Sequence, residues 1–316
     1  MSFVEENIVE RINNLYHDLD AHNYDKKHED ILVYEKERWN SIFAKYLKGS
    51  ENKILDYGCG TGFLSSTLLE SWSGQLSGLD CFDPSKEMLD FCCKKIGGIN
   101  YDSGIKVSLL NNINEIENYD IVILNSVLHH LPSIGTFFQQ TSRLLKEDGI
   151  LIIGHEPNKT FFENRFLFLF SKLVTCVKDP KSFLIWLLDI LYLKKIIKKI
   201  IKFNKNKEDE IVKEINRALI SEGLIDKEIG ASTIYQYIDF HSPTASGKLD
   251  SDRGFDKDVL EKLSSEYFSI VEYNTYDFLN RWPKGFIIKM IDKILSKLFF
   301  EKGSKFYVVF RKKASL

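Results

Sequence analysis

The chain has 316 residues, of which 43 are Lys or Arg and 45 are Asp or Glu, so its formal net charge is −2. This length can bury a large core, and α/β folds often exceed about 200 residues as one domain. Such a balanced charge gives no overall basic character, and we expect no nucleic-acid partner. The five cysteines include no C-x-x-C pair, which argues against a disulfide framework or a zinc site and favours a reducing, cytoplasmic location.

The N-terminal region, residues 1–48, has apolar residues at roughly helical spacing. We interpret it as a helical cap. Its beginning, residues 1–30, is polar and charged rather than apolar, so we expect no secretion signal.

A glycine-rich stretch follows the first predicted strand. Gly58, Gly60 and Gly62 alternate with other residues, and a predicted helix begins at Phe63. Glycine frees the backbone, and the N-terminus of a helix favours an anionic group. A dinucleotide-binding loop has the spacing G-x-G-x-x-G, whereas this loop has G-x-G-x-G preceded by Asp56. The spacing therefore favours a different nucleotide-like ligand.

The sequence D-x-G-C-G-T-G from Asp56 to Gly62 resembles the first motif of the class I S-adenosylmethionine-dependent methyltransferases. The resemblance implies an α/β fold, Rossmann-like, with a seven-stranded, mostly parallel sheet whose last strand is antiparallel. It also implies that the loop wraps the methionyl part of S-adenosylmethionine (SAM), with Asp56 near its amino group. The cofactor-binding residues implied in this motif are Asp56, Gly58, Cys59, Gly60 and Gly62.

A second motif of this family follows the second predicted strand, residues 76–82. The run D-P-S-x-x-M-L that begins at Asp83 resembles the second motif of the same family. There an acidic side chain accepts from both ribose hydroxyls, which implies a cofactor site that includes Asp83, Pro84 and Met88. Asp80 is the alternative ribose ligand, because Gly-Leu-Asp also fits the family pattern.

Three further cofactor contacts follow from the resemblance. Asn111 or Asn112, after the third predicted strand, would face the adenine amino group, and Asn125 follows the fourth strand. Tyr24 belongs to an aromatic and acidic lead-in of the kind in which a tyrosine closes over the cofactor. An ordinary amphipathic helix is the alternative interpretation of that lead-in.

Histidines gather after the fourth and fifth predicted strands, where ligands bind in open α/β sheets. His130 is the first choice for a general base or a substrate-orienting residue, followed by His155, Glu156 and then His241. His129 adjoins His130, so we expect the two side chains to diverge and interpret His129 as structural. The ligand spacing does not support a metal site, and we predict none.

The sequence also bears on the acceptor. The fourth strand ends in Asn125-Ser126, without the N-P-P-Y or Pro-Cys motifs of enzymes that methylate nucleobases or glutamine amides. The L-H-H-L run at residues 128–131 resembles methyltransferases of small molecules. We therefore predict in-line transfer of a methyl group from SAM to a small, lipophilic acceptor, with oxygen favoured. The alternatives are a peripheral membrane lipid methyltransferase and a non-catalytic scaffold with the same fold.

After residue 157 the family pattern ends. Two apolar runs there are shorter than the roughly 20 residues of a bilayer span. Residues 194–202 and 287–300 predict basic amphipathic helices, which are candidates for peripheral membrane contact, a lid or a homodimer interface. The predicted division is a cap at 1–48, a SAM-binding core at 49–156, a helical lid insertion at 157–230 and a completion of the core at 231–316.

Overall fold

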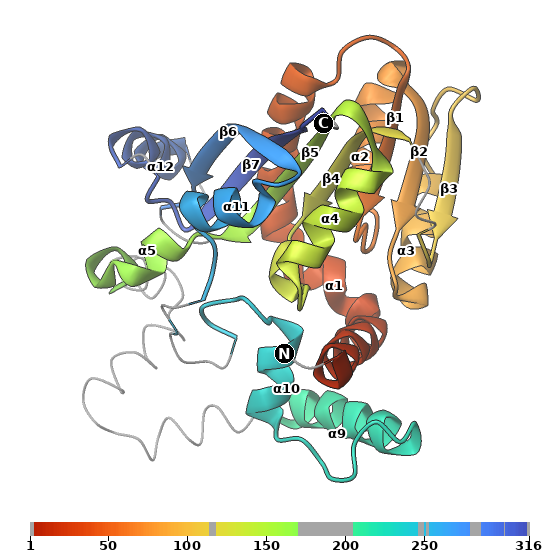
Figure 1. Cartoon of the computed structure of the whole chain (residues 1–316), viewed down its shortest axis with the longest axis vertical. Helices are drawn as coiled ribbons and strands as arrows, with labels where there is room; N and C mark the ends of the chain where they lie inside the picture. The colour runs from red at the N-terminus through yellow and green to blue at the C-terminus, as the bar shows by residue number, and fades with distance from the viewer. Residues whose placement is uncertain are drawn as a thin grey trace. The chain divides into compact units, whose positions relative to one another are not determined.

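The computed structural model describes residues 3–113, 118–169, 205–245, 250, 253–278, 286–299 and 301–314 (Figure 1). The chain forms two compact units. The sheet unit comprises Asn13–Glu156, Phe255–Asn274 and Phe306–Leu316, and the helical unit comprises Met1–Ile12, Pro157–Gly254 and Thr275–Lys305. The division into cap, core, insertion and completing segment stays a prediction.

The sheet unit is built on a seven-stranded sheet in the order β3-β2-β1-β4-β5-β7-β6. The central pairs β1–β2, β1–β4, β2–β3 and β4–β5 are parallel. The last strands are antiparallel, and β7 lies between β5 and β6, which confirms the predicted fold. The strands are β1 (Asn52–Tyr57), β2 (Leu76–Phe82), β3 (Lys106–Leu110), β4 (Tyr119–Asn125), β5 (Leu145–Pro157), β6 (Phe268–Tyr276) and β7 (Lys305–Lys312).

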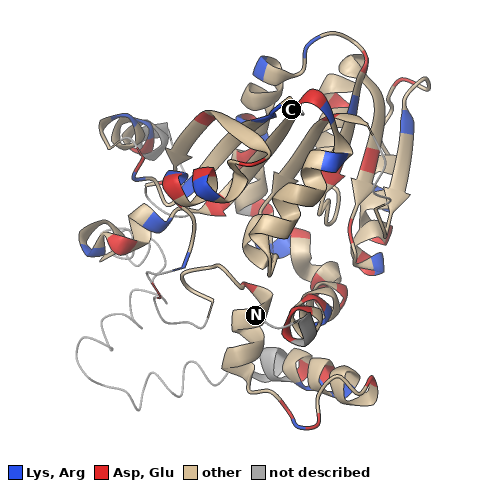
Figure 2. Cartoon of the chain, in the orientation of Figure 1, with Lys and Arg blue, Asp and Glu red and all other residues tan. Residues whose placement is uncertain are grey.

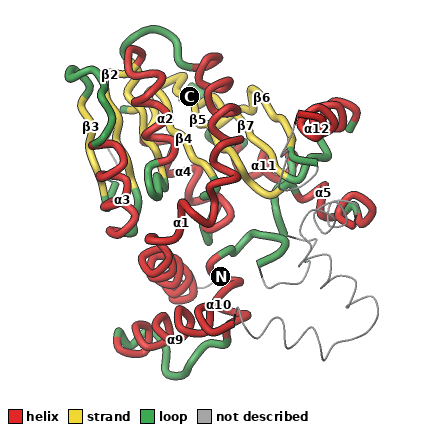
Figure 3. The backbone as a smooth tube through the Cα atoms, turned by 180° about the vertical axis from the view of Figure 1, so that it is seen from behind, coloured by secondary structure: helices red, strands yellow, loops and turns green. Residues whose placement is uncertain are grey.

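Helices cover both faces of this sheet (Figures 1 and 3). Within the sheet unit, the part of α1 (Phe3–Tyr46) from Asn13 onward, α2 (Phe63–Trp72) and α3 (Lys86–Gly97) pack on one face, and α4 (Ile134–Leu144) and α11 (Lys257–Ser264) pack on the other. Ile54 and Leu55 are adjacent in β1 and both fully buried, one in each of the two cores. Such burial on both faces is typical of a central parallel strand.

Capping residues fix where two of these helices begin. The Ser85 hydroxyl accepts from the Met88 N–H at 3.1 Å, and the Asp256 carboxylate accepts from the Val259 N–H at 2.8 Å. Each contact satisfies an N–H group that would otherwise lack a helical partner. In Figure 2 acidic and basic residues are interspersed on α11, consistent with the balanced charge of the chain.

The helical unit contains α5 (Lys159–Glu163), α9 (Lys205–Ser221), α10 (Ala231–Ile238) and α12 (Phe286–Leu298). The buried Asn158 side chain joins distant parts of this unit, because its amide donates to the carbonyls of Glu301 at 3.0 Å and Gly303 at 2.7 Å. No helix within the described residues is long and apolar enough to cross a membrane. The predicted basic helix at 194–202 lies outside the described residues, whereas α12 covers most of the one predicted at 287–300.

Candidate active site

The glycine loop leaves β1 with three left-handed residues. The φ angles of Gly58, Gly60 and Gly62 are 72°, 52° and 83°, a region that only glycine occupies without strain. A Cβ at Gly58 would lie 2.6 Å from Val127 Cγ2, and one at Gly62 would lie 2.7 Å from Cys92 Sγ. At Gly60 nothing lies within 4 Å of that position. The outer glycines therefore permit close packing, and the central one borders open space that suits a bound cofactor.

Asp83 lies beside this loop at the end of β2. One carboxylate oxygen accepts from the Gly60 N–H at 2.8 Å, and the other accepts from the Ser85 N–H at 2.9 Å. Burial raises the Asp83 pKa to about 6, and the nearby Asp18 carboxylate adds to the rise. Asp80 instead accepts from the Tyr119 hydroxyl at 2.8 Å. This arrangement favours Asp83 as the ribose ligand, which stays a prediction.

Asp56 is fully enclosed beneath the loop. Its carboxylate accepts from the Ser65 hydroxyl at 2.6 Å, and burial raises its pKa to about 7. Cys59 is also buried: a contact with Cys92 lowers the pKa of its thiol, but burial and the nearby carboxylates of Asp56 and Asp83 together raise that pKa to about 12. The contact of Asp56 with α2 fixes the helix to the strand, and its predicted role toward the cofactor amino group stays a prediction.

The helix α1 contacts the loop and the start of α3. Asp18 accepts from the Ser85 hydroxyl at 2.5 Å. Asp25 accepts from the Thr61 hydroxyl at 2.5 Å and forms an ion pair with Lys95. These contacts are 36 or more positions apart in sequence, and no pattern in the chain indicated them. They place the α1 segment that contains Tyr24 next to the glycine loop.

The other predicted cofactor residues occupy varied surroundings. Met88 is buried in α3, whereas Pro84 is exposed. Asn111 and Asn112 are exposed in the turn after β3. Asn125 accepts from the indole N–H of Trp39 at 2.7 Å, so the end of β4 is fixed to α1. The cofactor contacts of all these residues stay predictions.

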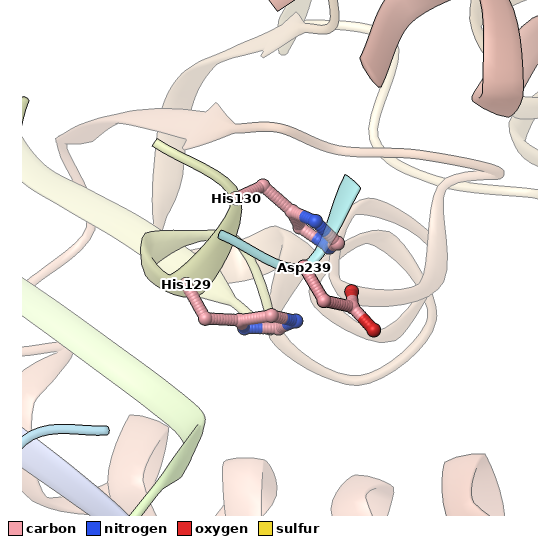
Figure 4. A group of neighbouring side chains, drawn as sticks. All are labelled: His129, His130 and Asp239. Carbon is pink, nitrogen blue, oxygen red and sulfur yellow. The ribbon is translucent and has the colours of Figure 1, made fainter. Parts of the chain in front are cut away.

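Glu156, at the end of β5, is fully buried and holds the loop after β4. Its Oε1 accepts from the Val127 and Leu128 N–H groups, both at 2.8 Å, and its Oε2 accepts from the His129 N–H at 3.1 Å. Oε2 also lies 2.8 Å from His129 Nδ1. A carboxylate only accepts, so Nδ1 carries the proton and Nε2 is the acceptor in the neutral ring. Figure 4 shows His129 and His130 on the short helix η2 (Leu128–His130).

The expectation that the His129 and His130 side chains diverge is wrong, because their ring centroids lie 4.1 Å apart. The turn of η2 brings both rings to the same side. The His130 ring also meets the His17 ring of α1 edge to face, with centroids 5.1 Å apart. The pairing of Glu156 with His129 was missed in the sequence, although their positions at the carboxyl ends of adjacent parallel strands could have indicated it.

The remaining predicted catalytic residues have other neighbours. His155 has a left-handed φ of 58°, and its Nδ1 lies 3.1 Å from Glu35 Oε1 on α1. His241 belongs to the helical unit, where its ring packs edge to face on Phe240 with centroids 5.0 Å apart. Since His130, His155 and Glu156 face different partners, the sheet unit gives no support to a metal shared by these three. Their catalytic roles stay predictions.

Residues 55–151, which include the glycine loop, Asp83 and the loop after β4, match a protein family described as a methyltransferase domain. This segment is a class I SAM-dependent methyltransferase domain. The match confirms the family predicted for this part of the chain and, with it, the predicted cofactor. The open space at Gly60, with the Asp83 carboxylate beside it, fits that cofactor.

Curated relatives of this methyltransferase domain include two kinds of O-methyltransferase. The malonyl-[acyl-carrier protein] O-methyltransferase of Legionella pneumophila is 29% identical over 43% of this chain and 48% of its own. The ubiquinone biosynthesis O-methyltransferase of Glaesserella parasuis is 28% identical over 39% of this chain and 50% of its own. The chain thus spans about half the length of these relatives. Among solved structures, the N-methyltransferase NodS of Bradyrhizobium japonicum aligns with 95% of this chain and 98% of its own at a TM-score of 0.48 and 12% identity.

Proposed function

We propose that the chain is an enzyme that transfers a methyl group from SAM to an oxygen atom of a small, lipophilic acceptor. The observation that carries this proposal is the convergence, within the sheet unit, of a glycine loop with open space at Gly60, the adjoining Asp83 carboxylate and the imidazoles after β4. These features lie at the carboxyl ends of parallel strands, where open α/β sheets bind their ligands.

The protein has three tasks in such a reaction. When bound, the cofactor supplies a methyl group already activated by its sulfonium. The glycine loop and Asp83 would hold the cofactor, with the carboxylate accepting from the ribose hydroxyls. The loop after β4 would align the acceptor, and alignment lowers the activation barrier by on the order of 7 to 11 kcal/mol. A positioned base adds roughly 10² to 10⁴ in rate, so alignment is the larger contribution.

Two observations support oxygen as the accepting atom. The relatives that the domain resembles bear the names of O-methyltransferases that act on a malonyl-[acyl-carrier protein] and in ubiquinone biosynthesis. A hydroxyl acceptor must also lose a proton, and the loop after β4 carries imidazoles that could accept it. Nitrogen acceptors with a free lone pair would need no such base.

The first test is cofactor binding, measured by titration calorimetry. We expect micromolar binding of SAM by the wild-type protein and at least a tenfold loss in Asp83→Asn. Glu87→Gln is the matched control, because Glu87 is an exposed carboxylate four residues further on, in the first turn of α3. No binding of SAM by the folded wild-type protein would contradict the proposed function.

The second test is methyl transfer from SAM labelled in its methyl group. We would offer a catechol, which presents hydroxyls, and a malonyl thioester, which presents a carboxylate. Label in either product, identified as a methyl ether or a methyl ester by mass spectrometry, would support an oxygen acceptor. Label found only in added amines would overturn the choice of oxygen.

A membrane-bound acceptor is a second candidate, favoured by the surface of α12. Met290, Ile291, Ile294 and Leu298 are all exposed on this helix, Leu298 at 72%, and the exposed Lys293 and Lys297 accompany them. Apolar and basic residues on one helix are typical of binding at an anionic membrane surface. Another copy of the chain could also cover this surface.

Vesicle co-sedimentation and light scattering separate these cases. Membrane contact predicts binding to vesicles with anionic lipid, weakened in a Lys293→Gln, Lys297→Gln variant and by salt. The matched control is Lys257→Gln, on the exposed side of α11. A homodimer predicts twice the monomer mass in light scattering, lost on Ile294→Ser. A monomer that ignores vesicles would exclude both.

A further inference from the structure

We propose that Asp18 and Asp25 of α1 are positioning residues of the cofactor site: together they hold the two backbone segments that fix the Asp83 carboxylate. This inference rests on the proposed function, because it takes SAM as the ligand and Asp83 as the residue that accepts from its ribose hydroxyls. It goes beyond that function by giving a part in cofactor binding to two carboxylates that lie outside both sequence motifs.

The Asp83 carboxylate is fixed by two backbone N–H groups. Its Oδ2 accepts from the Gly60 N–H at 2.8 Å, and its Oδ1 accepts from the Ser85 N–H at 2.9 Å. Gly60 belongs to the glycine loop after β1, whereas Ser85 is the N-cap of α3. A carboxylate oxygen has a second lone pair that can accept from a ligand. The direction of these lone pairs therefore depends on the positions of the glycine loop and of the start of α3.

The helix α1 holds both of these segments. Asp18 accepts from the Ser85 hydroxyl at 2.5 Å. Asp25 accepts at 2.5 Å from the hydroxyl of Thr61, which directly follows Gly60. Each of the two N–H donors to the Asp83 carboxylate thus belongs to a residue that α1 holds, or to the neighbour of such a residue.

These contacts lie on one face of α1. Asp18, His22 and Asp25 are spaced i, i+4 and i+7, which places them on the same side of a helix. The His22 ring meets the Phe91 ring of α3 edge to face, with centroids 5.1 Å apart. Lys95, also on α3, forms an ion pair with Asp25 at 2.7 Å. One face of α1 is therefore matched to the glycine loop and to α3.

The carboxylate contacts contribute little to the packing of α1 on the sheet. The side chains of Asp25 and Lys95 are 46% and 29% exposed, and ion pairs of this kind add little to stability. The apolar anchors of the helix lie further along the chain, where Trp39 and Phe43 are buried in the core that α1 shares with α2 and α3. The consequence of the carboxylate contacts is thus the placement of the segments that they hold.

Asp18 also acts on the charge of Asp83. In the described part of the sheet unit, the titratable groups that face Asp83 are Asp18 of α1, Asp56 of β1 and the Cys59 thiol of the glycine loop. Burial, with a smaller contribution from Asp18, raises the pKa of Asp83 to about 6. Because an ionised carboxylate accepts from both ribose hydroxyls, SAM affinity should rise as Asp83 loses its proton. Removing the Asp18 charge should move this rise to lower pH.

Two substitutions separate the position of Asp18 from its charge. Asp18→Ala removes both, whereas Asp18→Asn keeps an oxygen that can accept from the Ser85 hydroxyl. By calorimetry at neutral pH we expect Asp18→Ala to bind SAM about threefold to tenfold more weakly, the loss of one hydrogen bond, and Asp18→Asn to stay within about twofold of the wild type. At lower pH, Asp18→Asn should keep its affinity where the wild type loses it. Glu29→Ala, at an exposed position of the same helix, is the matched control.

A double-mutant cycle identifies the residue through which α1 acts. In an Asp83→Asn background the carboxylate that α1 positions is absent, so Asp18→Ala should weaken SAM binding by less than about twofold. Asp25→Ala should behave in the same way. Equal losses in the two backgrounds would overturn the inference, because the α1 carboxylates would then act independently of Asp83.

The outcomes also distinguish this inference from the proposed function. Urea unfolding of the same samples shows whether each variant is folded. No binding of SAM by the folded wild-type protein would overturn both the proposed function and this inference. A loss of SAM affinity in Asp83→Asn, with unchanged affinity in Asp18→Ala and Asp25→Ala, would refute this inference and leave the proposed function intact.

Thermodynamic linkage gives a measurement without substitutions. If contacts of α1 strengthen SAM binding, SAM must strengthen those contacts by the same factor. Saturating SAM should therefore slow hydrogen exchange of the α1 amides between residues 18 and 25 in the wild-type protein by about threefold or more. Exchange that SAM leaves unchanged would refute the proposed role of α1.

Discussion

Replacing Gly62 by alanine should destabilise the protein more than the same change at Gly60. Both residues have a left-handed φ, 83° and 52°, so both variants pay about 1 to 2 kcal/mol for placing a Cβ in that region. Only at Gly62 does the new Cβ meet a neighbour, 2.7 Å from Cys92 Sγ and 3.2 Å from Cys92 Cα. Overpacking of this kind adds about 1 to 3 kcal/mol.

The expected losses are therefore about 2 to 5 kcal/mol for Gly62→Ala and about 1 to 2 kcal/mol for Gly60→Ala. Urea unfolding without cofactor measures them, as a lower midpoint at unchanged slope. Calorimetry should give the opposite order, because the Cβ of Gly60→Ala enters the space assigned to SAM. Gly60→Ala would then be the more stable variant and the weaker binder.

A double-mutant cycle assigns the excess cost to one contact. In a Cys92→Ala background the sulfur is absent, so Gly62→Ala should cost less than it does in the wild type, with a coupling of about 1 kcal/mol or more. Equal losses of stability in Gly60→Ala and Gly62→Ala would refute the reasoning, since φ alone would then account for both. No coupling with Cys92 would refute the assigned contact.

Three further predictions concern the surroundings of the loop. The pKa of Asp83 is about 6 in the folded protein, above the 3.8 of an ordinary aspartate, so the unfolded chain releases this proton first. Stability without cofactor should therefore fall by about 2 kcal/mol as the pH rises from 4 to 6, and urea unfolding should find this slope reduced in Asp83→Asn. Trp39→Ala should cost about 3 to 5 kcal/mol in the same assay, because a fully buried indole leaves a cavity; a loss below 1 kcal/mol would contradict its place in the core. Asp25→Asn removes a partly exposed ion pair with Lys95 and should change the free energy of unfolding by less than about 1 kcal/mol. Hydrogen exchange of the α1 amides near residue 25 should nevertheless become faster. Unchanged exchange would show that the ion pair does not hold this part of α1 in place.

The sheet was predictable because its central strands are short, unbroken apolar runs with turn residues between them. In β4 the run from Ile121 to Leu124 is buried throughout, as a strand covered on both faces must be. Ser85 and Asp256 cap α3 and α11, and Ser and Asp are residues that favour this position at the start of a helix. The prediction of an antiparallel last strand depended on the family resemblance, because local patterns do not encode the pairing of distant strands.

The sequence predicted the positions of those site residues that directly follow the ends of paired strands. Asp83 follows β2 and the glycine loop follows β1, and because these strands pair in parallel, the carboxylate meets the Gly60 N–H. Side-chain directions in a loop were not predictable in this way. The turn of η2 brings the His129 and His130 rings together, and Glu156, which contacts His129, lies at the end of β5. Nor could the sequence show that α1 would bring Asp18 to the hydroxyl of Ser85, since a long polar helix has many faces that could pack there.

The buried carboxylates around the loop oppose the stability of the protein without its cofactor. Burial and mutual repulsion raise the pKa values of Asp56, to about 7, and Asp83, to about 6, with Asp83 raising the former and Asp18 the latter. Near neutral pH the folded protein without cofactor therefore holds charge that its surroundings oppose. In the proposed function the ribose hydroxyls and the cofactor's positive charge would offset that opposition. Relief of this unfavourable burial of charge would then add to the free energy of SAM binding. The same residues that lower the stability of the free protein would raise its affinity for SAM, as is common at functional sites.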